Sequence, residues 1–294
     1  MASEELQGVR ELMRGVDLGC LSIDERRAAM ESVAADPPAG TTVEPVDAGG
    51  VPAEWVIAAP PAGDRILLYL HGGGYQIGSP RTLRHVVAPL SAAAAAGVLS
   101  VGYRLAPEHP FPAAVDDALA AYRWLLGGGT DPATVALAGD SSGGGLALAT
   151  LVALRDGGEP MPAAAFAISP WTDLALTGES LRTRAAAELI LQPDGMPETA
   201  ALYLAGADPR HPYASPLYAD LRGLPPLLIQ VGDAEVVLDD STRFAARARE
   251  AGVDVTLEVW DEMPHVWHVF AGLLPEADQA IARAGRWLRS RLTR

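Results

Sequence analysis

Two glycine-rich segments carry residue types that could catalyse acyl transfer. Ser141 stands in Gly139-Asp140-Ser141-Ser142-Gly143, directly after a strand-like run at 134–138 and directly before a helical pattern. A strand-to-helix turn this sharp strains the serine backbone and exposes its hydroxyl at the helix N-terminus, where the helix dipole favours developing negative charge. An ordinary Gly/Ser-rich turn is the alternative for the five residues alone, but the strand and helix around them favour a nucleophile.

The second segment, His71-Gly72-Gly73-Gly74, follows a continuous apolar run at 66–70. Consecutive glycines let backbone N–H groups approach a substrate oxygen without obstruction, and with the N–H of Ser142 they could form an oxyanion hole. A phosphate cradle is the rival, but no Gly-x-Gly-x-x-Gly spacing and no lysine accompanies the glycines. His71 itself is expected to order the loop by hydrogen bonding.

A serine nucleophile needs a base, and in this architecture the chain order is serine, acid, histidine. His265 lies in the loop after an alternating strand pattern at 255–259, where such a base must sit. His268 stands three residues later, and the pair could suggest a metal; with no third ligand nearby, we expect no metal site and a His268 that packs against the last helix. The remaining histidines fall in unsuitable elements: His85, His109 and His211.

Four acidic residues after the run at 227–231 could supply the acid: Asp233, Glu235, Asp239 and Asp240. Asp239 and Asp240 fall in the first turn of a predicted helix, where stabilisation of the helix N-terminus explains them. Asp233 and Glu235 both lie on the loop itself. The residue pattern leaves these two open.

The rest of the chain alternates strand and helix patterns, which predicts a mostly parallel sheet with helices on both faces. Apolar patterning predicts strands at 41–46, 53–58, 66–70, 98–101, 134–138, 163–168, 227–231 and 255–259, and helices at 113–126, 146–155, 238–251 and 276–292. Residues 1–40 are helical in character, and the insertion after 168 has helical stretches at 181–191 and 197–204. We expect 1–40 and 171–215 to form a cap over a catalytic domain at 41–170 and 216–294.

The composition excludes several functions. The 294 residues include 22 basic and 37 acidic side chains, a net charge of −15, which argues against nucleic acid and anionic membranes. All basic residues are arginine, so Schiff-base and pyridoxal-phosphate lysines are excluded, as are Walker loops. Cys20 is the only cysteine, so no intrachain disulfide is possible. No secretory signal and no membrane span is apparent, and we expect a cytoplasmic protein.

Together these motifs resemble the bacterial hormone-sensitive-lipase-like esterases of the α/β-hydrolase fold. The resemblance extends from about residue 41 to the C-terminus, and more loosely over the N-terminal cap. It rests on His71-Gly72-Gly73-Gly74-Tyr75, Tyr103-Arg104-Leu105-Ala106-Pro107-Glu108-His109-Pro110-Phe111-Pro112-Ala113, Gly139-Asp140-Ser141-Ser142-Gly143-Gly144, Ser169-Pro170-Trp171, Ala214-Ser215-Pro216-Leu217 and the region ending at His265.

The resemblance assigns roles to particular residues. The family's Asp-Pro-Leu-x-Asp stretch matches Glu235-Val236-Val237-Leu238-Asp239, which places Glu235 on the acid position, with Asp233 two residues early. Carried over, the oxyanion donors are Gly73, Gly74 and Ser142. The resemblance also implies that Arg104 and Glu108 pair behind the active site. Asp140 is expected to support the nucleophile turn or its neighbouring loop without taking protons.

The function that the resemblance implies is hydrolysis of short-chain neutral carboxylic esters through an acyl-enzyme, without metal or organic cofactor. An amide or lactone hydrolase of the same fold is an alternative, and so is a non-catalytic hydrolase-fold binding protein. The partner would be a small-molecule ester. Relatives dimerise through an edge strand and last helix like those at 255–259 and 276–292, so the resemblance allows a homodimer.

Overall fold

The computed structural model describes residues 3–13 and 21–292, so that Cys20 lies outside the described residues. Its strands are β1 (Thr42–Asp47), β2 (Pro52–Ile57), β3 (Ile66–Leu70), β4 (Gly97–Val101), β5 (Val135–Asp140), β6 (Ala164–Ile168), β7 (Leu227–Gly232) and β8 (Val255–Trp260). Its helices are α1 (Glu5–Met13), α2 (Ile23–Ser32), α3 (Arg84–Ala94), α4 (Ala113–Gly127), α5 (Ser142–Asp156), α6 (Ser180–Thr183), α7 (Met196–Leu204), α8 (Leu238–Glu250) and α9 (Pro275–Arg291).

The strands form one sheet in the order β1-β2-β4-β3-β5-β6-β7-β8. β1 and β2 are antiparallel to their neighbours, and every pairing from β4 to β8 is parallel. This confirms the predicted mostly parallel sheet. Because parallel strands end at the same edge, the loops after β3, β5, β7 and β8 gather there.

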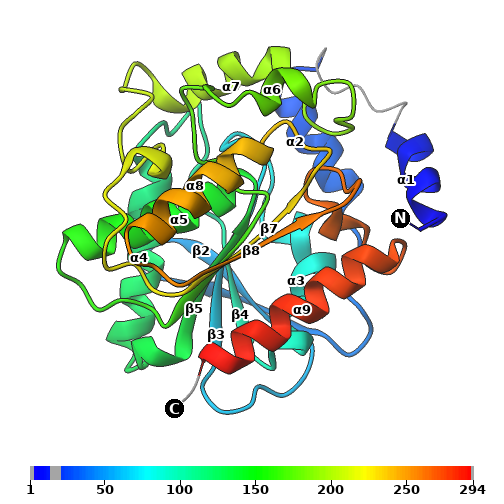
Figure 1. The fold of residues 1–294 in the computed structure, drawn as a ribbon. Helices are drawn as coiled ribbons and strands as arrows, with labels where there is room; N and C mark the ends of the chain where they lie inside the picture. Colours follow the sequence, from blue (N-terminus) through cyan, green and yellow to red (C-terminus); the bar gives the residue numbers. More distant parts are fainter. Residues whose placement is uncertain (1–2, 14–20, 293–294) are drawn as a thin grey trace.

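Helices cover both faces of the sheet (Figure 1): α3 and α9 lie on one face, and α4, α5 and α8 on the other. Along β3, Leu67 and Tyr69 pack into the core under α3 and α9, whereas Leu68 and Leu70 pack into the opposite core. A strand buried on both faces needs apolar side chains at every position, which explains the unbroken apolar run of β3.

One predicted helix is shorter in the structure, and one helix of the structure was not predicted. The helix predicted at 181–191 is limited to the single turn of α6, because the Glu188 carboxylate accepts the backbone N–H groups of Leu189, Ile190 and Leu191 and turns the chain there. Helix α3 was not predicted, since its alanine-rich second half has little periodicity and Pro89 stands inside it.

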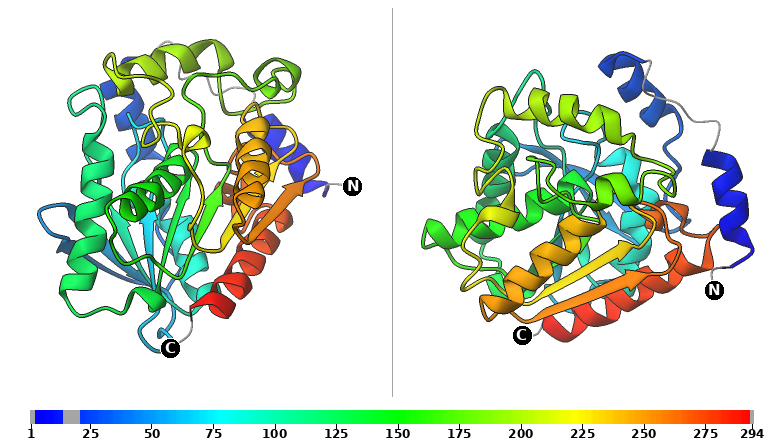
Figure 2. Two further views of the ribbon diagram at one scale, coloured as in Figure 1. Left: turned by 60° about the vertical axis from the view of Figure 1, so that its left-hand side comes forward. Right: turned by 45° about the horizontal axis from the view of Figure 1, so that its top comes forward.

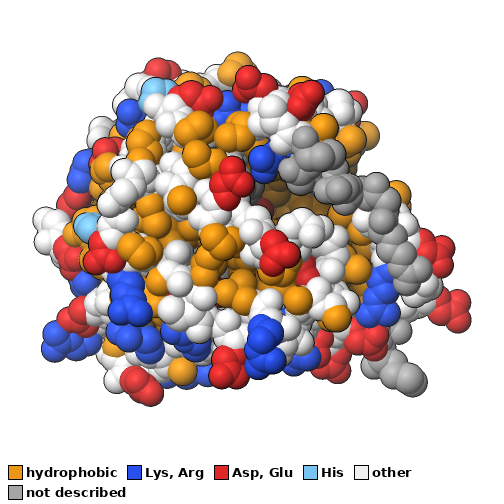
Figure 3. All heavy atoms as spheres, turned by 90° about the horizontal axis from the view of Figure 1, so that it is seen from above, with side chains coloured by type: hydrophobic (Ala, Val, Ile, Leu, Met, Phe, Trp, Pro, Cys, Tyr) orange, Lys and Arg blue, Asp and Glu red, His pale blue; other side chains and the backbone are white. Residues whose placement is uncertain are grey.

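Helices α2, α6 and α7 lie above the edge at which the parallel strands end (Figure 2). Seen from this side, hydrophobic side chains surround a hollow in the surface (Figure 3). Helix α1 lies apart from them, with Leu6 and Val9 buried against Trp267 and Phe270, and Ser3 donates two hydrogen bonds to Glu276.

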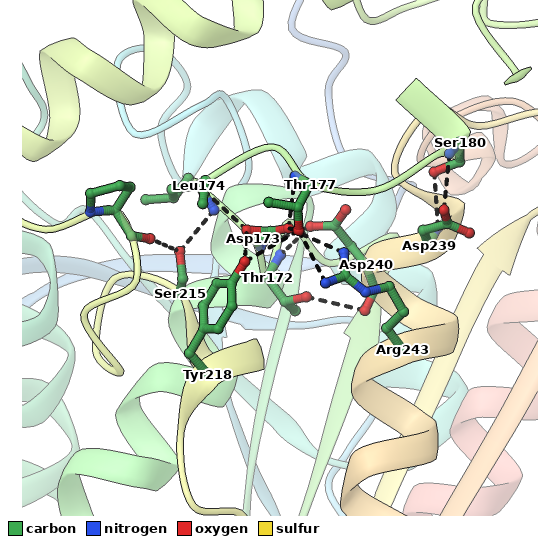
Figure 4. A network of polar contacts seen from close by, with 12 residues as sticks. Thr172, Asp173, Leu174, Thr177, Ser180, Ser215, Tyr218, Asp239, Asp240 and Arg243 are labelled. Atoms are coloured by element: carbon green, nitrogen blue, oxygen red, sulfur yellow. Dashed lines mark hydrogen bonds and ion pairs between the residues drawn. The ribbon is translucent and has the colours of Figure 1, made fainter. Parts of the chain in front are cut away.

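A buried polar network fixes the chain where it leaves β6 for this layer (Figure 4). Asp240 on α8 accepts the backbone N–H groups of Thr172 and Asp173, each at 2.8 Å. The Asp173 carboxylate pairs with Arg243 at 3.2 Å and accepts the Tyr218 hydroxyl at 2.9 Å. The network joins the segment after β6 to the helix that follows β7.

Candidate active site

Ser141 occupies the turn between β5 and α5. Its backbone has φ 53° and ψ −123°, a strained conformation for a residue with a side chain. The surrounding structure holds this conformation, because the Ser141 N–H donates to the Ile168 carbonyl and its carbonyl accepts from Gly145 and Trp171. Ser141 is nearly buried, with 9% of its surface exposed.

Glycines on either side of Ser141 are required by close backbone approach. A Cβ on Gly139 would overlap the carbonyl oxygen of Gly143, and a Cβ on Gly143 would overlap the carbonyl oxygen of Leu70. The turn therefore packs directly against the end of β3, beside the loop that carries the glycine triplet.

The structure brings three of the predicted residues into one hydrogen-bonded chain. His265 Nε2 lies 2.9 Å from Ser141 Oγ, and His265 Nδ1 lies 2.8 Å from Glu235 Oε2. These residues come from the loops after β5, β7 and β8, three parallel strands that end at the same edge of the sheet. His265 and Glu235 are buried, so the pair is shielded from water.

Burial and charge act on this pair together. Burial lowers the pKa of His265, but the hydrogen bond and negative charge of Glu235 outweigh it and raise that pKa above its ordinary value. Burial raises the pKa of Glu235, against the hydrogen bonds from His265 and Ser169 that favour its charged form. A proton is consequently held firmly within the pair.

Asp233, the other acid left open by the sequence, lies elsewhere: its Oδ1 accepts the Glu262 N–H at 2.6 Å. His268 lies in the turn 267–270, which packs on α9, and its Nε2 is 2.8 Å from Gln230 Oε1.

His71 stacks on Tyr103 with ring centroids 4.3 Å apart. Its Nδ1 lies 2.8 Å from the Gly72 carbonyl, and burial lowers the His71 pKa to about 4, so the imidazole is neutral and donates there.

The glycine triplet lies beside Ser141 in a conformation that only glycine adopts easily, with φ 114° at Gly73 and 62° at Gly74. Among the described residues, neither the Gly73 nor the Gly74 amide donates to another group. The N–H of Ser142, at the start of α5, has no partner inside the helix. The Ser142 hydroxyl accepts the Tyr75 N–H at 3.2 Å and joins this loop to the nucleophile turn.

Asp140 supports the same loop, as expected. Its Oδ1 accepts the Tyr69 hydroxyl at 2.9 Å and the Gly72 N–H at 3.0 Å. Burial raises the Asp140 pKa to about 6, although these hydrogen bonds favour the charged form.

The expected pairing of Arg104 with Glu108 is wrong. Arg104 instead forms a two-pronged ion pair with Asp117 on α4, at 2.8 Å, and Glu108 pairs with Arg27 on α2, also at 2.8 Å. Arg27 also donates to the Gln76 carbonyl and so holds α2 against the loop that carries the glycines.

In the described part of the chain, His, Cys, Asp and Glu side chains nowhere gather in groups of three that could hold a metal ion. No helix in the same part is long and apolar enough to cross a membrane.

Comparison with known proteins identifies the family of the chain. A model of a protein family described as an alpha/beta hydrolase fold matches residues 67–269. An acetyl-hydrolase of Streptomyces hygroscopicus is 50% identical over 298 residues, covering 99% of this chain and 98% of that protein. The solved structure of an esterase from the bacterial hormone-sensitive lipase family is 49% identical with a TM-score of 0.96, covering 100% of both chains. The structure of EstE5 soaked with p-nitrophenyl butyrate is also 49% identical, with a TM-score of 0.96 over 99% of each chain. The chain therefore belongs to the α/β-hydrolase fold family and, within it, to the hormone-sensitive-lipase-like bacterial carboxylesterases, enzymes that hydrolyse carboxylic esters.

Proposed function

We propose that this carboxylesterase uses Ser141 as nucleophile, His265 as base and Glu235 as acid, and that it acts on short-chain neutral esters. The hydrogen-bonded chain from Ser141 Oγ through His265 to Glu235 carries the proposal. It has the geometry that a base needs to take the serine proton and that an acid needs to orient the base.

In the first step His265 Nε2 takes the Ser141 proton while Oγ bonds to the ester carbonyl carbon. The N–H groups of Gly73, Gly74 and Ser142 hold the oxyanion, each donor lowering the barrier by about 3 kcal/mol. The tetrahedral intermediate then breaks its bond to the alcohol oxygen, which receives the proton from His265. Glu235 accepts the Nδ1 hydrogen bond throughout and stabilises the charged imidazole.

In the second step water attacks the acyl-enzyme. His265 takes a proton from the water, whose oxygen bonds to the acyl carbon. Collapse of this intermediate breaks the bond to Ser141 Oγ, which regains its proton from His265 and releases the carboxylic acid.

We further infer that residues 1–40 and 171–215 form a cap over a catalytic domain at 41–170 and 216–294. Contacts with Gln76, two residues after the glycine triplet, support this division for α2 and α7, whereas α1 packs against the segment after His265 and α9. The Gln76 backbone carbonyl accepts a hydrogen bond from Arg27 on α2, and the Gln76 side-chain amide donates one to the Thr199 carbonyl on α7.

The preference for short acyl chains rests on the relatives. An acetyl-hydrolase and an esterase soaked with p-nitrophenyl butyrate, both described by small acyl groups, are each close to half identical over nearly the whole chain.

The experiment that tests the proposal is hydrolysis of p-nitrophenyl esters from acetate to palmitate by wild type, Ser141→Ala, Glu235→Gln and Asp233→Asn. We expect turnover of the short esters only, its abolition by Ser141→Ala, and loss on the order of 10³-fold or more in Glu235→Gln. Asp233→Asn is the matched control and should retain activity. Collapse in Asp233→Asn instead would assign the acid to Asp233, and turnover of amides or lactones alone would redirect the substrate class.

A further inference from the structure

A buried serine outside the proposed triad touches both its acid and its base loop. Ser169 follows β6 directly and has no exposed surface. Its hydroxyl donates to Glu235 Oε1 at 2.7 Å and accepts the backbone N–H of Val266 at 3.1 Å. One hydroxyl thus joins the acid to the residue that follows the histidine.

The Glu235 carboxylate depends on this hydroxyl. Oε2 is occupied by His265, while Oε1 accepts only from Ser169 and from the Gly232 N–H at 2.6 Å, of the groups in the described residues. Because the carboxylate is fully buried, it has no contact with bulk solvent that would compensate for a lost donor.

The histidine loop depends on it as well. Val266 has φ 48°, in the left-handed region that a β-branched side chain disfavours. The hydrogen bond from its N–H to Ser169 holds this conformation and therefore sets the direction in which the preceding residue, His265, presents its ring.

The backbone of Ser169 is also held in position. Its N–H donates to the Gln230 carbonyl at 2.7 Å, and its φ of 44° turns the side chain at the end of β6. Both contacts of the hydroxyl are therefore made from a backbone position that is fixed at the end of β6, beside β7.

We propose that Ser169 is a positioning residue of the active site, which holds the Glu235 carboxylate and the His265 loop in register and shares the negative charge of the carboxylate. The proposal rests on the triad assigned above. Ser169 contacts neither substrate nor the reacting atoms of Ser141, so its effect on catalysis passes through the acid and the base.

Removal of the Ser169 hydroxyl should change the proton affinity of the Glu235–His265 pair in one direction. With one donor fewer, the charge of the carboxylate is less shared, so the Glu235–His265 pair binds a proton more tightly. The other acidic groups that act on His265 are Glu188, from the segment above the sheet, and Asp140 on β5. Both remain in the variants and cancel in a comparison with wild type.

The test is the pH profile of kcat/KM on p-nitrophenyl butyrate for wild type, Ser169→Ala and Ser169→Gly. The glycine variant also lacks the hydroxyl but accepts a φ of 44° without strain. In both variants we expect kcat to fall about tenfold or more with little change in KM, and the acid limb of the profile to move up by about one pH unit. The midpoint of that limb does not depend on how much of the protein is folded.

Ser100→Ala is the matched control. Ser100 is a fully buried serine on β4 whose hydroxyl has no partner among residues 3–13 and 21–292, so its variant should keep both kcat and the pH midpoint. An unmoved or lowered midpoint in the Ser169 variants, with wild-type kcat, would overturn the proposal.

Glu235→Gln, measured in parallel, distinguishes this failure from failure of the triad. If Glu235→Gln retains full activity, the triad assignment is wrong. If Glu235→Gln collapses while both Ser169 variants match wild type, only the role of Ser169 is wrong.

Discussion

At the scale of single residues, the charge of Glu235 controls the pH at which His265 becomes a base. Since that charge raises the His265 pKa against the effect of burial, wild-type kcat/KM should fall as pH decreases through a midpoint above the ordinary value of 6.5. In Glu235→Gln the charge is lost and burial remains, so the midpoint should move to lower pH. The pH profile of the residual activity checks this, and an upward shift contradicts it.

The conformation of Gly74 gives a second residue-scale prediction. A side chain at Gly74 would be strained by φ 62°, and its Cβ would lie 2.8 Å from Thr199 Cγ2 on α7. Gly74→Ala should therefore displace the oxyanion loop and lower kcat by about tenfold or more. Gly195→Ala is the control, since no atom lies within 4 Å of its added Cβ. Full activity of Gly74→Ala on p-nitrophenyl acetate would contradict the expected displacement of the loop.

The residues of the site differ in how far the sequence could predict them. Ser141 and the glycine triplet stand in local motifs, because backbone strain and close approach demand glycine at fixed spacing. The choice of Glu235 over Asp233 needed a family resemblance, since both lie on one loop. Ser169 was not predicted: its partners are 66 and 97 positions away, and its only signal was the family's Ser-Pro-Trp motif.

At the scale of elements, α3 and α9 approach so closely that one glycine is decisive. A Cβ on Gly285 would overlap the backbone of Ala93. Although alanine favours helices by about 1 kcal/mol over glycine, we expect Gly285→Ala to lower the free energy of unfolding by roughly 1–3 kcal/mol. Gly8→Ala, on α1 with no atom within 4 Å of the added Cβ, should instead be neutral or stabilising. Urea denaturation of both variants measures the difference, and equal stability would contradict the close packing.

Elements were predicted best where burial leaves a pattern. The strands buried on both faces appear as short apolar runs, and β3 matches its prediction at both ends. Helix α3 lacked such a pattern, because small alanines fit against a neighbouring helix without marking one face. In the second half of the helix predicted at 181–191, the Glu188 side chain takes backbone N–H groups that a helix would use.

At the scale of the whole molecule, Asp240 makes stability depend on pH. Burial, followed by the charge of Asp173, raises the Asp240 pKa to about 8 from an ordinary 3.8. The folded state therefore keeps a proton that the unfolded state has released, and stability falls as pH rises towards 8 and then levels off. Burial lowers the pKa of His71 to about 4 and that of His268 to about 3. These two residues make stability rise with pH, but only below pH 6.5.

Thermal unfolding should show this effect between pH 6.5 and about 9, where Asp240 and the raised pKa of His265 act in the same direction. Asp240→Asn keeps an oxygen for the Thr172 and Asp173 N–H groups but cannot ionise, so its Tm should fall less over this range than that of wild type. Asp239→Asn removes the same charge from a neighbouring, partly exposed side chain and should keep the wild-type slope. Equal slopes in wild type and Asp240→Asn would contradict the buried titration.

The packing of α1 has a consequence for how the protein is made. Ser3 binds Glu276, 273 positions later in the chain, and Leu6 and Val9 are buried against the segment that follows His265. A ribosome adds about 5–20 residues per second, so roughly 15–55 s pass between the synthesis of α1 and that of the residues it packs against. During that time its apolar face is open to chaperones and to other nascent chains. The segment that follows His265 is thus packed against a helix that was synthesised well before it.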